Sequence, residues 1–124
     1  MSKRYTDDHE WAALDGETVT IGITNYAQEQ LGEIVFVELP DLDRALSQGE
    51  EAAVIESVKA AGEVKSPVGG TVVEVNESLN DAPETVNESP EGDGWIYKVK
   101  VSSTDEFESL MAEADYQSLV DSLA

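Results

Sequence analysis

Much of the chain alternates between hydrophobic and polar residues with a period of two, which is typical of β-strands with one buried face. In residues 16–24 this alternation places Val19, Ile21 and Ile23 on one face. Three further runs rich in β-branched and aromatic residues are also predicted to be strands: residues 32–40, 71–75 and 95–101. The pattern therefore predicts a mainly β protein.

Residues 53–70 contain two short runs of small and β-branched side chains, separated by Lys59 and Ala60. Strands favour such side chains, and runs this close in sequence can be joined by a tight turn. The segment is therefore predicted to be a β-hairpin with Lys59 near its tip. The residues beside Lys59 are uncharged, so no immediate neighbour would hold its ammonium group in a salt bridge. From spacing alone, Lys59 is either a solubilising charge on a turn or the attachment point of a tethered group carrier.

A short helix is predicted after the first strand. Asn25 can cap it, with Gln28 at its third helical position and Gly32 just past its end. Only about two helical turns fit between these limits.

Two segments are predicted to be connections without a regular pattern. Residues 41–50 form a loop in which Leu42 and Leu46 turn inward. Residues 76–90 contain asparagines, serines and two prolines, which are typical of a long connection.

The last part of the chain changes from a period of two to a helical period. Ser103 and Glu106 have the spacing of a capping box, and Asp115 can cap a further helix. The hydrophobic residues fall into two helical stripes: Phe107, Leu110, Met111 and Ala114 in the first, and Tyr116, Leu119, Val120 and Leu123 in the second. Two short helices over about residues 103–123 are therefore predicted to pack on the sheet.

Two residues near the N-terminus stand out chemically. Trp11 is expected in the core or in a strand. His9 is the only histidine, and cysteine is absent, so no ligand set for a transition metal is recognised and His9 is expected to be structural. Without cysteine there is also no disulfide framework and no thiol nucleophile.

The net charge of the chain says more about its partners and surroundings than its overall composition does. The 124 residues, of which 40% are hydrophobic, are expected to form one domain over residues 1–124. Twenty-seven acidic residues against seven basic ones give a net charge of −20, which would repel nucleic acid and anionic membranes. Such a surface fits either a high-salt cytoplasm or steering toward basic partners. No signal peptide or membrane span is recognised, so a cytoplasmic location is expected.

The central hairpin carries a more specific signal. Residues 56–60 (Glu-Ser-Val-Lys-Ala), followed by residues 64–70, resemble the lipoyl-attachment hairpin of lipoyl-carrier proteins. In that family a glutamate three residues before the lysine and a glycine eleven residues after it help the lipoylating enzyme to recognise the site. Glu56 and Gly70 occupy these positions. The resemblance implies lipoate attached to Lys59.

Biotin carriers share this fold but usually flank their lysine with methionines, whereas Met1 and Met111 are the only methionines here. Lys65 lacks the surrounding motif and is not expected to be modified. The resemblance implies a flattened barrel-sandwich hybrid of the lipoyl/biotinyl type, with a short helix after the first strands and two short C-terminal helices.

Further motifs extend the resemblance across roughly residues 5–120 to the H proteins of the glycine cleavage system. These motifs are His9-Glu10-Trp11, residues 21–32, residues 34–40 and Gly94-Trp95. The resemblance implies a non-catalytic carrier. Its lipoyl-lysine receives the aminomethyl group of glycine from the pyridoxal-phosphate enzyme glycine decarboxylase and delivers it to the tetrahydrofolate-dependent aminomethyltransferase. Dihydrolipoyl dehydrogenase then reoxidises the arm. The alternative is a lipoyl-relay protein that serves another lipoamide-dependent system.

The resemblance also implies a cleft for the loaded arm. In the family the arm folds back near the His-Glu-Trp segment, where acidic groups meet the aminomethyl cation. Glu10 and Glu63 occupy matching positions, and Tyr26 stands where some members have a histidine. Their charge is physically reasonable, because an amine withdrawn from water needs a counter-charge. No residue of the chain itself is expected to be catalytic.

Overall fold

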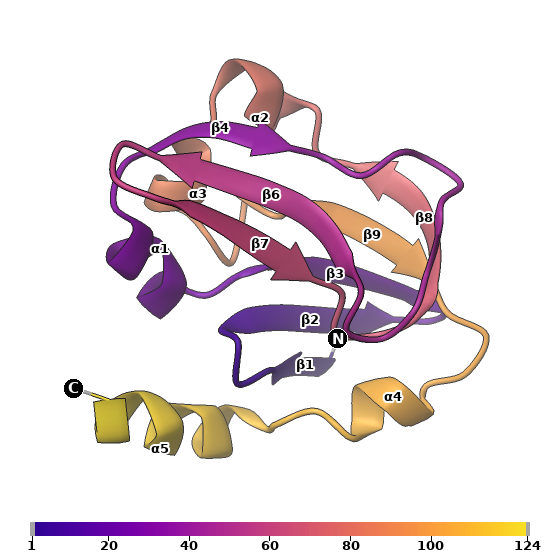
Figure 1. Cartoon of the computed structure of the whole chain (residues 1–124). Coiled ribbons are helices and arrows are strands. Elements are labelled where there is room, and N and C mark those ends of the chain that lie inside the picture. Colours follow the sequence, from indigo (N-terminus) through magenta and orange to yellow (C-terminus); the bar gives the residue numbers. More distant parts are fainter. Residues whose placement is uncertain (1, 124) are drawn as a thin grey trace.

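The computed structural model describes residues 2–123, which form two antiparallel β-sheets with short helices at their edges (Figure 1). The larger sheet has six strands, in the spatial order β1 (Ser2–Tyr5), β2 (Glu10–Asp15), β3 (Thr18–Ile23), β9 (Tyr97–Lys100), β8 (Gly70–Val75) and β5 (Ala45–Leu46). The smaller sheet has three, in the order β4 (Ile34–Glu38), β6 (Glu51–Ser57) and β7 (Ala61–Lys65). The prediction of a mainly β protein is confirmed.

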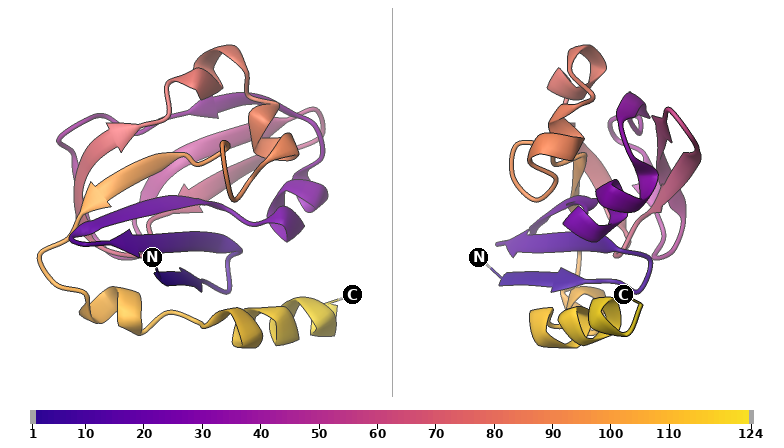
Figure 2. Two further views of the ribbon diagram at one scale, coloured as in Figure 1. Left: turned by 180° about the vertical axis from the view of Figure 1, so that it is seen from behind. Right: turned by 90° about the vertical axis from the view of Figure 1, so that its left-hand side faces the viewer.

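The main hydrophobic core contains side chains from both sheets, which lie side by side when the molecule is viewed edge-on (Figure 2). Val19, Ile21 and Ile23 of β3 are all buried, as their alternation predicted. Ile55 of β6 and Val64 of β7 belong to the same cluster from the smaller sheet. Burial of each such side chain contributes roughly 1.5–3 kcal/mol to the stability of the fold. Because these side chains are buried only when the two sheets face each other, the core fixes how the sheets are arranged.

The predicted hairpin is confirmed, since β6 and β7 pair antiparallel up to Glu56 and Ala61. The Ser57 amide donates to the Ala60 carbonyl at 2.7 Å, which closes the turn. The Ser57 hydroxyl oxygen also accepts from the Lys59 and Ala60 amides, at 3.3 and 3.0 Å. Lys59 therefore stands exposed on a turn that is held from inside by a serine side chain.

Strands β1 and β2 did not follow from the sequence pattern, because Ser2–Tyr5 is short and mostly polar. Tyr5, Trp11 and Ala13 from these strands form a second, smaller core with Tyr116 of the C-terminal helix. The Tyr5 and Tyr116 rings stack at a centroid distance of 4.7 Å, which fixes the C-terminal helix against the N-terminal strands. The expectation that Trp11 lies in the core or in a strand is confirmed, since it is buried on β2.

Helix α1 (Asn25–Leu31) is present where a short helix was predicted, but the predicted cap was wrong. Thr24, not Asn25, is the N-cap, and its Oγ1 accepts from the Ala27 amide at 3.3 Å. Asn25 is already helical, and Gln28 therefore lies one position later than predicted. Gly32 ends the helix with φ +82°, a left-handed conformation that favours glycine, as predicted.

The segment predicted to be a loop over residues 41–50 contains the two-residue strand β5. Leu46 is buried as expected, but the prediction for Leu42 was wrong, since this side chain is 55% exposed. Leu46 is turned inward because it pairs with Gly70 across the edge of the larger sheet, whereas Leu42 lies outside any strand.

The long connection over residues 76–90 is more regular than predicted. It contains two single-turn helices, α2 (Ser78–Asp81) and α3 (Thr85–Glu88). Each buries one side chain, Leu79 and Val86, in the main core, and this packing gives the segment its helical turns.

Two C-terminal helices are present as predicted, α4 (Asp105–Glu108) and α5 (Glu113–Leu123), but both predicted caps were wrong. Glu106 does not close a capping box, because its carboxylate accepts from the Gly69 amide at 2.6 Å on another part of the chain. Helix α5 already begins two residues before Asp115.

The two hydrophobic stripes are only partly buried. Phe107 and Tyr116 are buried, whereas Ala114 and Leu123 at the ends of the stripes are exposed. Helix α5 runs below β1, along the edge of the larger sheet, so only one side of it meets the protein (Figure 1). No described helix is long and apolar enough to cross a membrane.

Candidate functional site

The Lys59 side chain lies over the end of helix α1. A Cβ placed on Gly32 would sit 3.3 Å from Cε of Lys59, so this glycine provides a flat surface under the lysine stem. The ion pairs found among residues 2–123 involve other basic residues. Lys59 is therefore an exposed amine on a fixed turn, as the sequence predicted.

Exposed apolar side chains surround this turn. The pairing of β4 with β6 shifts register between Ile34 and Phe36, and such bulges redirect side chains. Val35 and Phe36 are both about half exposed, and Val58 beside Lys59 is more exposed still. Apolar groups gathered in this way are typical of contact surfaces.

Glu56, predicted to help recognition by the lipoylating enzyme, lies within this surface. It is exposed and pairs directly with Phe36 on β4. Its carboxylate is therefore available to a protein that approaches Lys59.

Gly70 lies elsewhere. It begins β8 in the larger sheet, after β7 has carried the chain away from the turn. A Cβ at Gly70 would meet the Lys100 carbonyl oxygen at 2.5 Å, so a glycine is needed for β8 to approach β9. This is a packing reason for the glycine and is independent of any recognition by an enzyme.

A pocket of about 220 Å³ lies beside the hairpin, between α1, the segment before β2, and strands β6 and β7. Glu10, Tyr26 and Glu63, the three predicted cleft residues, all line it. Leu31 and Gly62 complete the side nearest the turn, and a Cβ on Gly62 would be 3.3 Å from Leu31. Because Leu31 immediately precedes the glycine under Lys59, the pocket adjoins the lysine stem.

Glu10 is the buried carboxyl of this pocket, only 3% exposed. Its Oε1 accepts from the Thr6 hydroxyl and its Oε2 from the Lys65 amide, both at 2.9 Å. Burial raises the pKa of Glu10 to about 7, although both hydrogen bonds favour the charged form. Glu10 thus joins β2 of one sheet to β7 of the other and titrates near neutral pH.

Glu63 and Tyr26 contribute differently. Strand alternation places Glu63 on the face of β7 opposite buried Val64, and its carboxylate raises the pKa of the neighbouring Glu51 carboxyl. Glu63 therefore belongs to the rim of the pocket. The Tyr26 ring lies against His9, with centroids 4.5 Å apart.

The sequence model of the glycine cleavage H-protein matches residues 3–123, almost the whole chain. The chain belongs to the glycine cleavage H-protein family. A relative from Parvibaculum lavamentivorans, named glycine cleavage system H protein, is 53% identical over 120 residues, which cover 97% of this chain and 96% of the relative. One of the same name from Thermotoga maritima is 50% identical over 115 residues, 93% of each chain.

A crystal structure of a glycine cleavage system H protein from Mycobacterium marinum is similar throughout. The two are 35% identical, and the superposition has a TM-score of 0.85 over 94% of each chain. The predicted flattened barrel-sandwich fold is thereby confirmed. Members of the H-protein family are carriers rather than catalysts, and they carry lipoate on a lysine.

The residues around the turn fit a lipoyl group. Lys3, Lys98 and Lys100 each lie within 4 Å of a glutamate oxygen, whereas Lys59 stands on the hairpin turn beside a pocket with apolar and acidic walls. No group of three or more His, Cys, Asp or Glu placed to hold a metal is found in residues 2–123.

Asn87 was missed by sequence analysis. Its Oδ1 accepts from the Ile34 amide at 2.8 Å, and its Nδ2 donates to Gln28 Oε1 and to the Gly32 carbonyl, at 2.9 and 2.8 Å. It therefore fixes α3 to the glycine under Lys59. No local signal could have revealed it, because its partners are more than 50 residues away.

Proposed function

We propose that this chain is the lipoyl carrier of a glycine cleavage system, with lipoate joined as an amide to Nζ of Lys59. The observation that carries the proposal is an exposed lysine, fixed on a tight turn beside a pocket, in a chain that matches the H-protein family almost throughout. Lys59 would hold lipoate, which would supply a cyclic disulfide whose S–S bond can open, so that one sulfur accepts the aminomethyl group of glycine and the other becomes a thiol.

The protein's own contribution is presentation of the lysine. The Ser57 hydroxyl holds the turn through the backbone amides of Lys59 and Ala60, and Gly32 gives the lysine stem a surface without a side chain. A group tethered to such a point meets a partner's active site at a raised effective concentration. No catalytic side chain is required for this role.

We also propose that the lipoylating enzyme contacts Glu56. Its position beside half-exposed Phe36 and next to the Lys59 turn supports direct contact. The contact of Gly70 with Lys100 supports a different role for this glycine, in which it keeps β8 against β9.

The pocket is proposed to receive the arm. Its apolar wall includes Leu31 and would cover the arm, and Glu10 supplies a counter-charge for an amine. Tyr26 forms part of the wall, and Glu63 adds negative charge at the rim.

We propose glycine decarboxylase, aminomethyltransferase, dihydrolipoyl dehydrogenase and a lipoylating enzyme as the partners. The net charge of −20 supports partners whose docking faces are basic, since complementary charge speeds association. A cytoplasmic location, adaptation to high salt and a single carrier domain over residues 1–124 stay predictions from the sequence.

Mass spectrometry of Lys59→Arg tests the proposal, with Lys65→Arg as the matched control. Each purified variant is incubated with a lipoylating enzyme and then with the three glycine cleavage enzymes, and glycine turnover is measured. We expect lipoate on Lys59 alone, no turnover above background for Lys59→Arg, and normal modification and turnover for Lys65→Arg. Arginine keeps the positive charge but offers no amine for acylation.

Lipoate on Lys65, or turnover by Lys59→Arg, would contradict the assignment of the lysine. Normal lipoylation of Lys59 without glycine turnover would instead favour a lipoyl relay for another system. Circular dichroism and the melting temperature establish that both variants are folded.

A further inference from the structure

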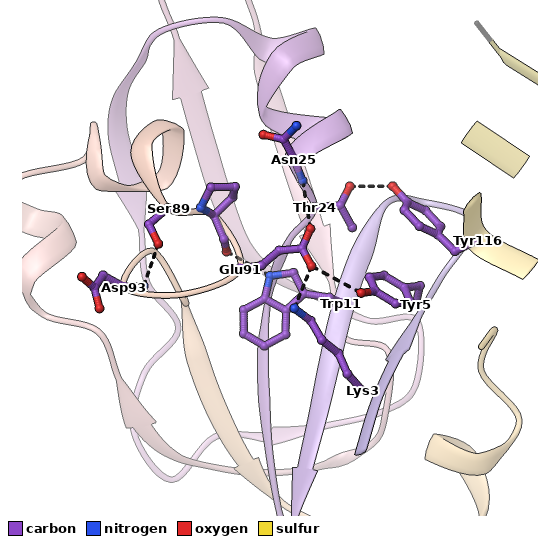
Figure 3. A network of polar contacts seen from close by, with 10 residues as sticks. Lys3, Tyr5, Trp11, Thr24, Asn25, Ser89, Glu91, Asp93 and Tyr116 are labelled. Atoms are coloured by element: carbon purple, nitrogen blue, oxygen red, sulfur yellow. Dashed lines mark hydrogen bonds and ion pairs between the residues drawn. The ribbon is translucent and has the colours of Figure 1, made fainter. Parts of the chain in front are cut away.

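A chain of hydrogen bonds joins helix α5 to the proposed arm pocket. The Tyr116 hydroxyl on α5 is buried, 2.6 Å from Thr24 Oγ1 and 2.9 Å from His9 Nδ1. Thr24 Oγ1 also accepts from the Ala27 amide at 3.3 Å. Figure 3 shows the Tyr116 and Thr24 side chains pointing toward each other. His9, at the far end of this series of hydrogen bonds, lines the pocket together with Glu10.

The direction of donation follows from the fixed end of this chain. The Ala27 amide can only donate, so Thr24 Oγ1 accepts there. Thr24 is only 1% exposed, and within residues 2–123 the Tyr116 oxygen is the one acceptor in reach of its hydroxyl proton. A buried donor without an acceptor is costly, so Thr24 donates to Tyr116. Tyr116 has one proton, which then points to Nδ1 of His9. Nδ1 accepts only when it carries no proton, so the proton of the neutral imidazole lies on Nε2.

The neutral form of His9 suits the pocket. Burial lowers the pKa of His9, while the nearby carboxylates of Asp8 and Asp7 act in the opposite direction. A neutral ring adds no positive charge beside Glu10, whereas an imidazolium would repel an incoming amine.

We propose that Tyr116 is a positioning residue of the arm pocket, whose hydroxyl holds His9 in the Nε2–H tautomer and couples α5 to the pocket wall. The purpose of the pocket rests on the proposed function, whereas the hydrogen-bond chain does not. His9 and Tyr116 are 107 residues apart in the sequence. The part of the pocket wall that His9 forms therefore depends on a helix near the other end of the polypeptide.

Nitrogen NMR of the histidine ring tests this directly, because His9 is the only histidine and gives one unambiguous set of ring signals. Spectra are compared for unmodified wild type, Tyr116→Phe and Tyr5→Phe at neutral pH. Tyr116→Phe keeps the ring that stacks on Tyr5 but loses the hydroxyl. Tyr5→Phe removes the other hydroxyl of the stacked pair, which lies 3.4 Å from Glu91.

We expect wild type to be mainly the Nε2–H tautomer, and Tyr116→Phe to shift the tautomer ratio by about fivefold toward Nδ1–H, as expected for the loss of one ordinary hydrogen bond. Tyr5→Phe should leave the ratio unchanged. A purely structural role for Tyr116 would lower the stability of Tyr116→Phe without changing the tautomer ratio.

A wild-type ring protonated on Nδ1, or a ratio unchanged in Tyr116→Phe, would overturn the proposal. The wild-type spectrum decides the first point even if a variant fails to fold. Intact mass of the lipoylated protein is measured separately. Absence of lipoate on Lys59 would overturn the proposed function and leave the tautomer result standing.

Discussion

Replacement of Glu10 by glutamine should remove a pH-dependent cost of folding. The carboxyl is buried, and its pKa rises from an ordinary value of 4.5 to about 7. Between these values the unfolded chain has released the proton while the folded protein still holds it. The folded state therefore binds more protons, and stability falls as pH rises through this interval.

The size of the effect follows from the difference between the two pKa values. At about 1.4 kcal/mol for each tenfold change in proton affinity, a rise from 4.5 to about 7 corresponds to about 3 kcal/mol. The cost is absent below the lower value, grows between the two and is constant above the higher one. Glutamine can keep both contacts, because its carbonyl can accept from the Lys65 amide and its NH₂ group can donate to Thr6 Oγ1.

Urea unfolding from about pH 3.5 to about pH 8 in salt of order 1 M, where interactions among the other carboxylates are screened, measures this cost. Glu10→Gln should gain about 3 kcal/mol relative to wild type across the range, with a plateau at each end. Glu38→Gln, which removes an exposed carboxylate from β4 of the smaller sheet, controls for the loss of one charge. A Glu10→Gln difference that stays constant within about 0.5 kcal/mol would refute the reasoning.

Two further predictions concern charge and packing. With a net charge of −20, the melting temperature should rise from about 0.1 M to about 1 M sodium chloride, since the screening length falls from about 10 Å to about 3 Å. Sodium sulfate at equal ionic strength separates screening from salting-out, and a flat curve would count against adaptation to high salt. Gly70→Ala should lower the unfolding free energy by about 1–3 kcal/mol, because its Cβ would meet the Lys100 carbonyl. An unchanged value in denaturant unfolding would show that the strands move apart freely.

Local pattern was sufficient for the hairpin and for most strands. Val19, Ile21 and Ile23 are buried as their alternation predicted, and Lys59 lies on the turn between β6 and β7. Such features depend on which side chains neighbour each other along the chain, and periodicity records this directly.

The helix caps were predicted less well, for a physical reason. A polar side chain can form hydrogen bonds to several different backbone groups, and the fold of the whole chain decides which of these groups lies close enough. Thr24 caps α1 while also contacting Tyr116, and Glu106 is taken up by the Gly69 amide from another segment. No local window of sequence contains these partners.

The order of residues alone was enough to predict the exposed lysine, the strands that hold it and the family to which the chain belongs. The family resemblance already grouped Glu10, Glu63 and Tyr26 in a cleft, and the structure shows that they line one pocket. That His9 faces this pocket with Tyr116 behind it is seen only in the folded chain. Periodicity tells which face of an element is buried. The residues that this face contacts are far apart in the sequence, and which of them meet is decided only when the whole core is buried.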